Sequence, residues 1–204
     1  MAIIISVDGN IGSGKSTFVA QLKKQLRWIN NKKIIYLQEP VKEWEAFVDK
    51  ETNENILEKF YTNPDNWSFS FQMMAYISRV AQLKNIINKH KNDNYVIITE
   101  RSVLTDKNVF AQMLYDVNKI HDIDYQIYLR WFDEFVEDFP ICGYIYVNTS
   151  PELCDKRIKI RNREGEVIPL EYLQRCDNYH EKWLNNINEK KPIGKPINIP
   201  SSLS

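Results

Sequence analysis

The feature that most constrains this chain is a glycine-rich stretch near its N-terminus, Gly9–Thr17. Residues 3–7, just before it, form a short β-branched run that predicts a buried strand, and residues 18–26, just after it, carry apolar side chains at helical spacing. A G-x-x-x-x-G-K-[ST] pattern between a strand and a helix is typical of a loop that holds the phosphates of a nucleotide. The alternative is a glycine-rich turn that binds nothing, but the flanking elements and the intact Lys15-Ser16 pair favour the phosphate loop.

Each residue type in this loop suits phosphate binding. Glycines let the backbone turn where a Cβ would be penalised, so that N–H groups face inward, and the following helix adds its positive N-terminal end. The Lys15 side chain can reach the β- and γ-phosphates, and the Ser16 hydroxyl can bind Mg²⁺. We therefore expect the nucleotide to contact Gly9, Asn10, Ile11, Gly12, Ser13, Gly14, Lys15, Ser16 and Thr17.

Length and charge limit the remaining function classes. The 204 residues suit one domain, with room for a lid, and no repeat or interdomain linker divides them. The 27 basic and 27 acidic residues balance, which gives no electrostatic case for binding a nucleic-acid polymer or an anionic membrane. No apolar run reaches the roughly 18 residues needed to span a bilayer. Three cysteines without metal-ligand spacing indicate reduced thiols, so we expect a cytoplasmic protein.

Strands alternate with helices along the chain, which predicts an α/β fold with a parallel sheet wrapped on both faces. We expect further strands over residues 33–38, 95–99 and 142–147, a weak fifth strand over 197–199, amphipathic helices over 68–88 and 126–137, short helices and a loop over 44–67, and a loose end over 200–204.

Charged residues follow two of these strands. Glu39 ends the strand over 33–38, and Glu100 and Arg101 follow the strand over 95–99. Ligands of open α/β sheets gather at the carboxyl ends of strands, so topology places Glu39 near the phosphate loop. A solvated acid at a strand end is the alternative for Glu39.

Two helical stretches carry unusual side chains. Over 68–88 one stripe mixes an aromatic, an amide, a small residue and an arginine, which suits either the border of the core or the wall of a polar pocket. Farther along, Arg157 and Arg161 share a helix face and Arg163 lies just beyond. Such arginines bind phosphate oxygens in fork geometry, although a solvated basic helix has the same pattern.

Taken together, these segments resemble the deoxyribonucleoside kinases of the deoxycytidine/deoxyguanosine kinase group. The likeness runs from the phosphate loop to about Trp183. It rests on five motifs in order: the phosphate loop, Glu39-Pro40-Val41 with Trp44, Trp67-Ser68-Phe69 with Phe71-Gln72, Glu100-Arg101-Ser102, and Ile168-Pro169-Leu170-Glu171-Tyr172-Leu173. The resemblance implies a P-loop NTPase-type three-layer α/β/α fold with a five-stranded parallel sheet, one domain over 1–204 and an arginine-rich lid over about 157–168.

The resemblance also implies an activity, the attack of a deoxynucleoside 5′-hydroxyl on the γ-phosphate of ATP in nucleotide salvage. Glu39 matches the family's general base, and Arg101 matches the arginine beside the 5′-oxygen. Ser16 and Glu100 match the residues that hold Mg²⁺, directly or through water. The remaining catalytic residues implied are Lys15 and the lid arginines Arg157, Arg161 and Arg163.

Further matches concern the acceptor nucleoside. Tyr61 matches the tyrosine on the sugar 3′-hydroxyl. Its acidic partner is Glu166 or Glu164, because this lid is one residue shorter than the family pattern. Ile11 is expected to touch the acceptor as well. The base pocket implied is lined by Trp44, Leu57, Phe71 and Phe110, with Phe110 stacking on the ring.

The pair Arg79 and Asp106, with small Ala75 nearby, bears on the choice of base. An ionised Asp106 can accept a hydrogen bond from the exocyclic amine of cytosine, while the Gln72 amide bonds to the neighbouring edge of the base. Arg79 either holds Asp106 in place or donates hydrogen bonds to N7 and O6 of a purine. Thymine presents a carbonyl oxygen there, and the unpaired buried carboxylate costs on the order of 1–3 kcal/mol. We therefore expect deoxycytidine and purine deoxynucleosides to be favoured over thymidine.

Two rival functions share the phosphate loop. A nucleoside monophosphate kinase, such as a thymidylate kinase, would need a cationic site where Glu39 stands. A non-catalytic nucleotide-binding subunit, known from one respiratory complex, would have lost Glu39, Lys15 or the lid arginines. The expected partners are therefore a small deoxynucleoside and ATP, with no nucleic acid and no membrane. Family members are usually homodimers through helices that include the one with Arg79, so we expect a homodimer.

Overall fold

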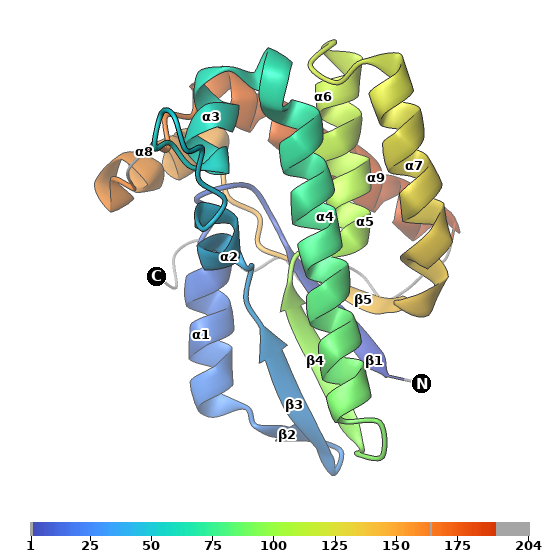
Figure 1. Cartoon of the computed structure of the whole chain (residues 1–204). Helices are drawn as coiled ribbons and strands as arrows, with labels where there is room; N and C mark the ends of the chain where they lie inside the picture. Colours follow the sequence, from blue (N-terminus) through green and yellow to red (C-terminus); the bar gives the residue numbers. More distant parts are fainter. Residues whose placement is uncertain (1, 164, 191–204) are drawn as a thin grey trace.

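A computed structural model describes residues 2–163 and 165–190 of the chain (Figure 1). Over these residues, one five-stranded sheet with the strand order β2-β3-β4-β1-β5 forms the centre. The strands are β1 (Ile3–Asp8), β2 (Trp28–Ile29), β3 (Lys32–Leu37), β4 (Tyr95–Glu100) and β5 (Ile141–Tyr146). Neighbours among β3, β4, β1 and β5 pair in parallel, as the alternating pattern of the sequence predicts.

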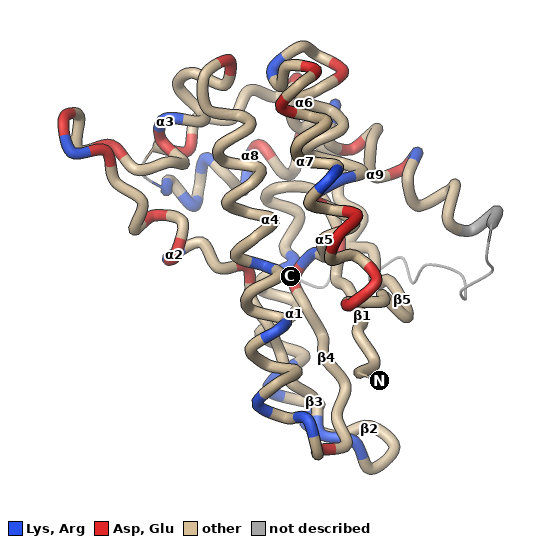
Figure 2. The backbone as a smooth tube through the Cα atoms, turned by 45° about the vertical axis from the view of Figure 1, so that its right-hand side comes forward, with Lys and Arg blue, Asp and Glu red and all other residues tan. Residues whose placement is uncertain are grey.

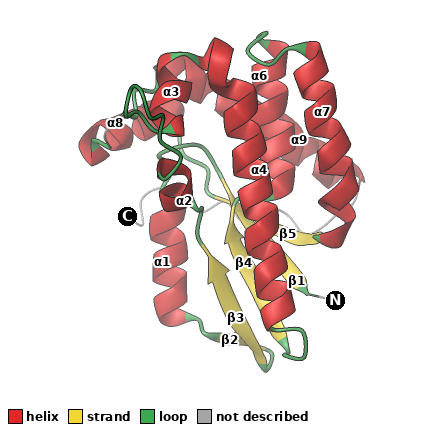
Figure 3. Cartoon of the chain, in the orientation of Figure 1, coloured by secondary structure: helices red, strands yellow, loops and turns green. Residues whose placement is uncertain are grey.

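Helices lie on both sides of this sheet (Figure 3). The helical segments are α1 (Lys15–Gln25), α2 (Val41–Glu45), α3 (Ile56–Thr62), α4 (Pro64–Lys89), α5 (Val103–Thr105), the π-helical η1 (Asp106–Ala111), α6 (Gln112–Asp116), α7 (Asp122–Phe135), the 3₁₀-helical η2 (Val136–Asp138), α8 (Pro151–Arg161) and α9 (Leu170–Lys190). Within the described ranges, no helix is both long and apolar enough to cross a membrane.

Alternation along the strands divides the core into two layers, because successive strand residues point to opposite faces. Ile4 of β1 and Ile97 of β4, both fully buried, belong to the large cluster that includes residues of α4, α7 and α9. Val7 and Ile98 lie on the opposite face, in a smaller cluster with Val19 of α1. The three-layer α/β/α fold is therefore confirmed, and it brings the carboxyl ends of β1, β3 and β4 to one edge.

The four predicted strands that the structure describes are parallel, but the sheet also contains a short strand that the sequence pattern did not predict. The fifth described strand is β2, which pairs antiparallel with β3. Asn30 and Asn31 form the two-residue turn between them, with φ values of 47° and 60°, as a tight hairpin requires. The Asn-Asn pair was the signal for this hairpin. The weak strand predicted over 197–199 lies outside the described residues.

The helices differ from expectation mainly at their ends. The helix predicted over 68–88 begins one turn earlier, where the Asn63 side chain accepts a hydrogen bond from Asn66 N. The segment over 44–67 contains the end of α2, all of α3 and the start of α4, and α3 begins with a capping box between Asn55 and Glu58. After β4, the chain forms three short helical pieces with a π-helical turn in the middle, a distortion frequent at functional sites.

The zero net charge conceals an uneven distribution. No acidic residue occurs between Asp8 and Glu39, and Lys and Arg gather around α1 and the β2–β3 hairpin (Figure 2). Apart from Lys15 at the start of α1, the basic residues there are Lys23, Lys24, Arg27, Lys32 and Lys33. These positions lie toward the end of the sheet away from the phosphate loop. The electrostatic potential at the site is therefore set mainly by the charged groups described below.

Candidate active site

The phosphate loop joins β1 to α1 and is packed closely from behind. At Gly12, with φ of 76°, an added Cβ would lie 2.7 Å from the carbonyl oxygen of Cys154, so α8 leaves no room for a side chain. Lys15 opens α1 and is 4% exposed, and its Nζ donates to the Asn10 carbonyl oxygen at 2.6 Å. Burial, and then the charge of Arg101, lowers the pKa of Lys15 to about 8. The Lys15 ammonium group is therefore already positioned by the loop, and phosphate oxygens can replace the Asn10 carbonyl oxygen as its hydrogen-bond acceptor.

A cleft of about 1190 Å³ opens over this loop. The phosphate loop from Ile11 to Phe18 forms one wall, and the segment after β3 from Gln38 to Lys42 forms another. It is also lined by Glu100, Arg101, Arg157, Arg161 and Arg163. The structure thus brings the predicted loop, strand-end and lid residues around one space large enough for ATP phosphates.

Ser16 and Glu100, the two predicted metal residues, are in direct contact. Ser16 Oγ donates to Glu100 Oε1 at 2.6 Å. Mg²⁺ prefers oxygen ligands and is usually held by one or two carboxylates together with substrate phosphates and water. The hydroxyl and the carboxylate, side by side at the edge of the cleft, fit that preference.

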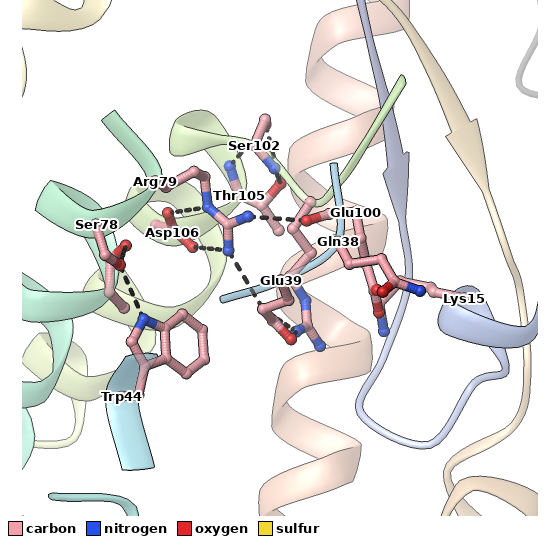
Figure 4. Close-up of polar contacts among 12 residues, drawn as sticks. Lys15, Gln38, Glu39, Trp44, Ser78, Arg79, Glu100, Ser102, Thr105 and Asp106 are labelled. Carbon is pink, nitrogen blue, oxygen red and sulfur yellow. Dashed lines mark hydrogen bonds and ion pairs between the residues drawn. The ribbon is translucent and has the colours of Figure 1, made fainter. Parts of the chain in front are cut away.

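Glu39 lies at the centre of a cluster of arginines (Figure 4). Arg101 Nη1 donates to both of its carboxylate oxygens, at 2.6 and 2.8 Å, and Arg79 Nη2 donates to Oε1 at 3.2 Å. Burial alone would raise the pKa of Glu39, but Arg101 and then Arg79 outweigh it and lower the pKa to about 2. Glu39 is therefore ionised, and the alternative of a freely solvated acid does not hold.

Arg101 is held in a strained conformation to make this contact. Its φ of 59° is left-handed, which is uncommon for a residue with a side chain. Its backbone N–H donates to the Val7 carbonyl oxygen at 3.0 Å, and its guanidinium lies 4.9 Å from the centre of the Phe110 ring. Strand pairing and the aromatic face together fix the arginine between Glu39 and the neighbouring pocket.

A second, smaller cavity of about 70 Å³ adjoins Glu39 and Arg101. It is lined by the residues expected around the base except Arg79, namely Trp44, Leu57, Phe71, Gln72, Ala75, Asp106 and Phe110, and also by Tyr61, which was expected on the sugar. Ile11 lines both this cavity and the main cleft, as expected of a residue between the two substrates. The mixed stripe on α4 is therefore the wall of a pocket.

Sequence reasoning missed three residues that line this cavity, Val41, Phe60 and Tyr172. Phe60 stacks on Phe71 with ring centres 4.6 Å apart. Its place beside Tyr61 on α3 was the available signal. Tyr172 lies within one of the recognised motifs, yet nothing in the linear pattern indicates that α9 returns to this pocket.

Arg79 lies behind the pocket and does not line it. The side chain is 1% exposed, its Nε donates to Asp106 Oδ2 at 2.8 Å, and its Nη1 donates to the Glu100 carbonyl oxygen at 2.8 Å. Burial alone would lower the pKa of Arg79, but Asp106 and Glu39 raise it, so it stays protonated. Of the two roles considered for Arg79, the geometry favours holding Asp106 over direct contact with a purine.

The lid places Glu166 among its arginines. The Glu166 side chain is 5% exposed and lies 2.5 Å from Arg161 Nη2 and 4.0 Å from Arg163 Nη1. Its charge also contributes, after burial, to a raised pKa of Tyr61, which places the two residues near each other. Residue 164, the other candidate for the sugar contact, lies outside the described residues. Arg157 donates from Nη1 to the Ser13 carbonyl oxygen at 2.9 Å.

Comparison with known proteins identifies the family of the chain. A family model described as deoxynucleoside kinase matches residues 5–199. A probable deoxycytidine kinase of fowlpox virus is 37% identical over 189 residues, which cover 91% of this chain and 73% of the viral protein. Deoxycytidine kinase 1 of Xenopus laevis is 36% identical over 200 residues, covering 89% and 74% of the two chains. The mitochondrial deoxyguanosine kinase of the same animal is 30% identical over 213 residues, covering 96% and 78%. The chain therefore belongs to the deoxynucleoside kinase family.

Proposed function

We propose that this deoxynucleoside kinase transfers the γ-phosphate of ATP to the 5′-hydroxyl of deoxycytidine and purine deoxynucleosides, in preference to thymidine. The observation that carries the proposal is the buried carboxylate of Asp106, fixed by Arg79 at the end of the small cavity beside Gln72. The names of the relatives, deoxycytidine and deoxyguanosine kinases, support the same choice of base.

Glu39 acts on the acceptor hydroxyl. With a pKa of about 2 it is a weak base in the unliganded enzyme. Phosphoryl transfer passes through a loose transition state, so the nucleophile needs orientation more than early deprotonation. Glu39 accepts a hydrogen bond from the 5′-hydroxyl and takes its proton as the new bond to phosphorus forms, while Arg101 keeps the carboxylate at the mouth of the pocket.

The donor side stabilises the charge of the transferring phosphoryl group. Lys15 and the loop N–H groups bind the β- and γ-phosphates, and the lid residues Arg161 and Arg163 approach from the other side of the cleft. Ser16 and Glu100 would hold Mg²⁺, which when bound would neutralise charge on the phosphate oxygens. The phosphate loop and the lid arginines thus stabilise the charge that develops on the phosphoryl group, while Glu39 orients the attacking hydroxyl.

Base selection follows from hydrogen-bond polarity. An ionised Asp106 is acceptor-only, so it pairs with an exocyclic amine, and the Gln72 amide supplies a donor and an acceptor to the adjacent edge. A carbonyl oxygen at the same position leaves the buried carboxylate unpaired. The sugar is held by Tyr61 and Glu166, and Phe110 stacks on the base.

A nucleoside monophosphate kinase remains the alternative within enzymes. Its acceptor carries a phosphate dianion where this chain presents the carboxylate of Glu39. Repulsion between the two anions favours a neutral 5′-hydroxyl instead. A non-catalytic subunit has still less support, because Lys15, Glu39 and the lid arginines are all present around one cleft.

One steady-state panel tests the proposal. We expect ATP and Mg²⁺ to support phosphorylation of deoxycytidine and at least one purine deoxynucleoside. The kcat/KM for thymidine should be lower than that for deoxycytidine by a factor of about ten or more. Deoxycytidine and thymidine monophosphates serve as the alternative acceptors in the same assay. Thymidine as the best substrate would contradict the base preference, and activity only on the monophosphates would establish the alternative enzyme.

We also propose that the enzyme is a homodimer through α4 and α7, which pack beside one another (Figure 1). Ile123, Ile127 and Trp131 recur every four residues on α7 and are 72%, 41% and 46% exposed, and Ile77 of α4 is 41% exposed. Light scattering after gel filtration should give twice the 24.2 kDa of the chain, and Trp131→Glu should give the monomer. A monomeric wild type would contradict this assembly.

A further inference from the structure

One nitrogen of Arg79 is shared by the two carboxylates of the acceptor site. Nη2 lies 3.2 Å from Glu39 Oε1 and 3.3 Å from Asp106 Oδ1. The other two nitrogens are anchored at 2.8 Å, Nε on Asp106 and Nη1 on the Glu100 carbonyl oxygen. Figure 4 shows the guanidinium between the carboxylates of Asp106 and Glu39.

The guanidinium cannot adjust to one carboxylate without affecting the other. It is planar and rigid, and at 1% exposure water does not replace a partner that it loses. The anchor on Glu100 holds one corner, so the remaining freedom is a small rotation that moves Nη2 toward Asp106 or toward Glu39. Any change in the hydrogen bonding of Asp106 therefore changes the share of Nη2 that Glu39 receives.

Arg101 alone does not fix the orientation of Glu39. Both of its hydrogen bonds to the carboxylate come from one nitrogen, Nη1. A contact through one donor atom leaves the carboxylate free to turn about that atom. Nη2 of Arg79 provides the second donor, and the two together define the plane in which the Glu39 oxygens lie.

We propose that Arg79 is a positioning residue for Glu39 and makes its placement depend on the base of the acceptor. This inference rests on the proposed function. An exocyclic amine that donates to Asp106 supplies part of the hydrogen bonding of that carboxylate and leaves Nη2 to Glu39. A carbonyl oxygen at the same place supplies no donor, so Asp106 keeps its full hold on Nη2. Base identity is then expressed in turnover as well as in binding.

The variant Arg79→Lys tests this directly, because a lysine keeps the charge but has one compact donor group in place of a fork. With deoxycytidine as substrate, we expect kcat to fall by a factor of up to about 100. This factor should exceed the factor by which KM rises. The removal of one donor also raises the pKa of Glu39 toward its ordinary value. The acid side of the kcat/KM profile should therefore move to higher pH.

Two further variants separate positioning from base binding. Asp106→Asn should raise KM for deoxycytidine more than it lowers kcat, because Nη2 then turns to Glu39. Ser78→Ala is the matched control, since Ser78 is next to Arg79 on α4 and accepts a hydrogen bond from Trp44 Nε1 at 2.8 Å. Ser78→Ala should change KM for deoxycytidine, while the acid side of its kcat/KM pH profile stays at the wild-type position.

An unchanged acid side and an unchanged kcat in Arg79→Lys would overturn the proposal and leave Arg79 as a support for Asp106 alone. If that variant does not fold, the double variant Arg79→Met/Asp106→Asn removes both buried charges together, and its pH profile decides in the same way. Failure of the proposed function would look different, because the wild type itself would then not phosphorylate deoxycytidine.

Discussion

The acceptor side of the site and the lid both pair arginines with glutamate, but they do so in opposite surroundings. Side chains of Arg79 and Arg101 are 1% and 7% exposed, whereas those of Arg161 and Arg163 are 38% and 37% exposed. The acceptor-side arginines belong to the strand ends and α4 of the core, and the lid arginines follow or end α8. One cluster is therefore built into the fold, and the other lies at its surface.

The difference indicates how the two halves contribute to catalysis. A buried ion pair that loses one member leaves a charge without water or partner, so the acceptor side has one arrangement. Glu166 is itself buried, but water reaches Arg161 and Arg163 and can solvate them, so these arginines can leave Glu166 for phosphate oxygens at smaller cost. The structure thus orients the nucleophile in advance, while the cations for the transition state are gathered when ATP binds.

Glu39→Gln should give the largest effect, because it removes the one carboxylate that faces the 5′-hydroxyl. We expect kcat to fall by about 10²–10⁴-fold while ATP affinity changes little, since the phosphate loop is untouched. The turnover rate with deoxycytidine measures the catalytic loss, and calorimetry of ATP binding measures the affinity of the phosphate loop. Glu43→Gln, on the exposed face of α2, is the control. Near-normal turnover in Glu39→Gln would remove Glu39 as the base.

Arg161→Met tests the lid half of the comparison. Loss of one charged donor to the transferring phosphoryl group should lower kcat by about 100-fold, with KM for the nucleoside nearly constant. Thermal unfolding should stay close to that of the wild type, because the side chain is partly exposed. Lys159→Met removes another cation of α8, which pairs along its own helix with Asp155, and should leave kcat unchanged. A marked loss of stability in Arg161→Met would make the lid as pre-ordered as the acceptor side.

Sequence reasoning found the parts of the site that local pattern encodes. Strand, loop and helix periodicity placed the phosphate loop, and the rule that ligands gather at strand ends placed Glu39 beside it. The mixed stripe on α4 left core border and pocket wall open. Only resemblance to a family separated the two, because periodicity shows which residues share a face and says nothing about what that face meets.

What remained beyond the sequence are contacts that depend on long-range placement. The left-handed backbone of Arg101 follows from its position between β1 and η1, and no local signal marks it. Tyr172 reaches the base pocket because α9 packs against η1, 60 residues or more away in the chain. The sharing of Arg79 Nη2 between two carboxylates depends on differences of a few tenths of an ångström, which residue types and spacing do not carry.

Arg79→Met with Asp106→Ala tests the selectivity of the buried half. The pair disappears as a unit, so no unpaired charge is left, and thymine no longer meets an acceptor where it needs a donor or a neutral wall. We expect the ratio of kcat/KM for thymidine over deoxycytidine to rise by about tenfold or more. If the ratio stays constant, base selection lies elsewhere in the pocket and the acceptor side is ordered for catalysis alone.

The smallest expected effect is that of Glu166→Gln on stability, and its comparison with Asp106→Ala sets the two carboxylate–arginine clusters side by side. Glu166→Gln leaves two arginines that water can reach, so the free energy of unfolding should fall by less than about 1 kcal/mol and the difference should shrink in high salt. Asp106→Ala leaves Arg79 buried beside an empty space, and the loss should be about 3 kcal/mol or more. Urea unfolding of both variants at pH 7 measures the two values. Equal losses would mean that Glu166 holds the lid as firmly as Asp106 holds Arg79, and the lid arginines could then reach ATP only after a costly release.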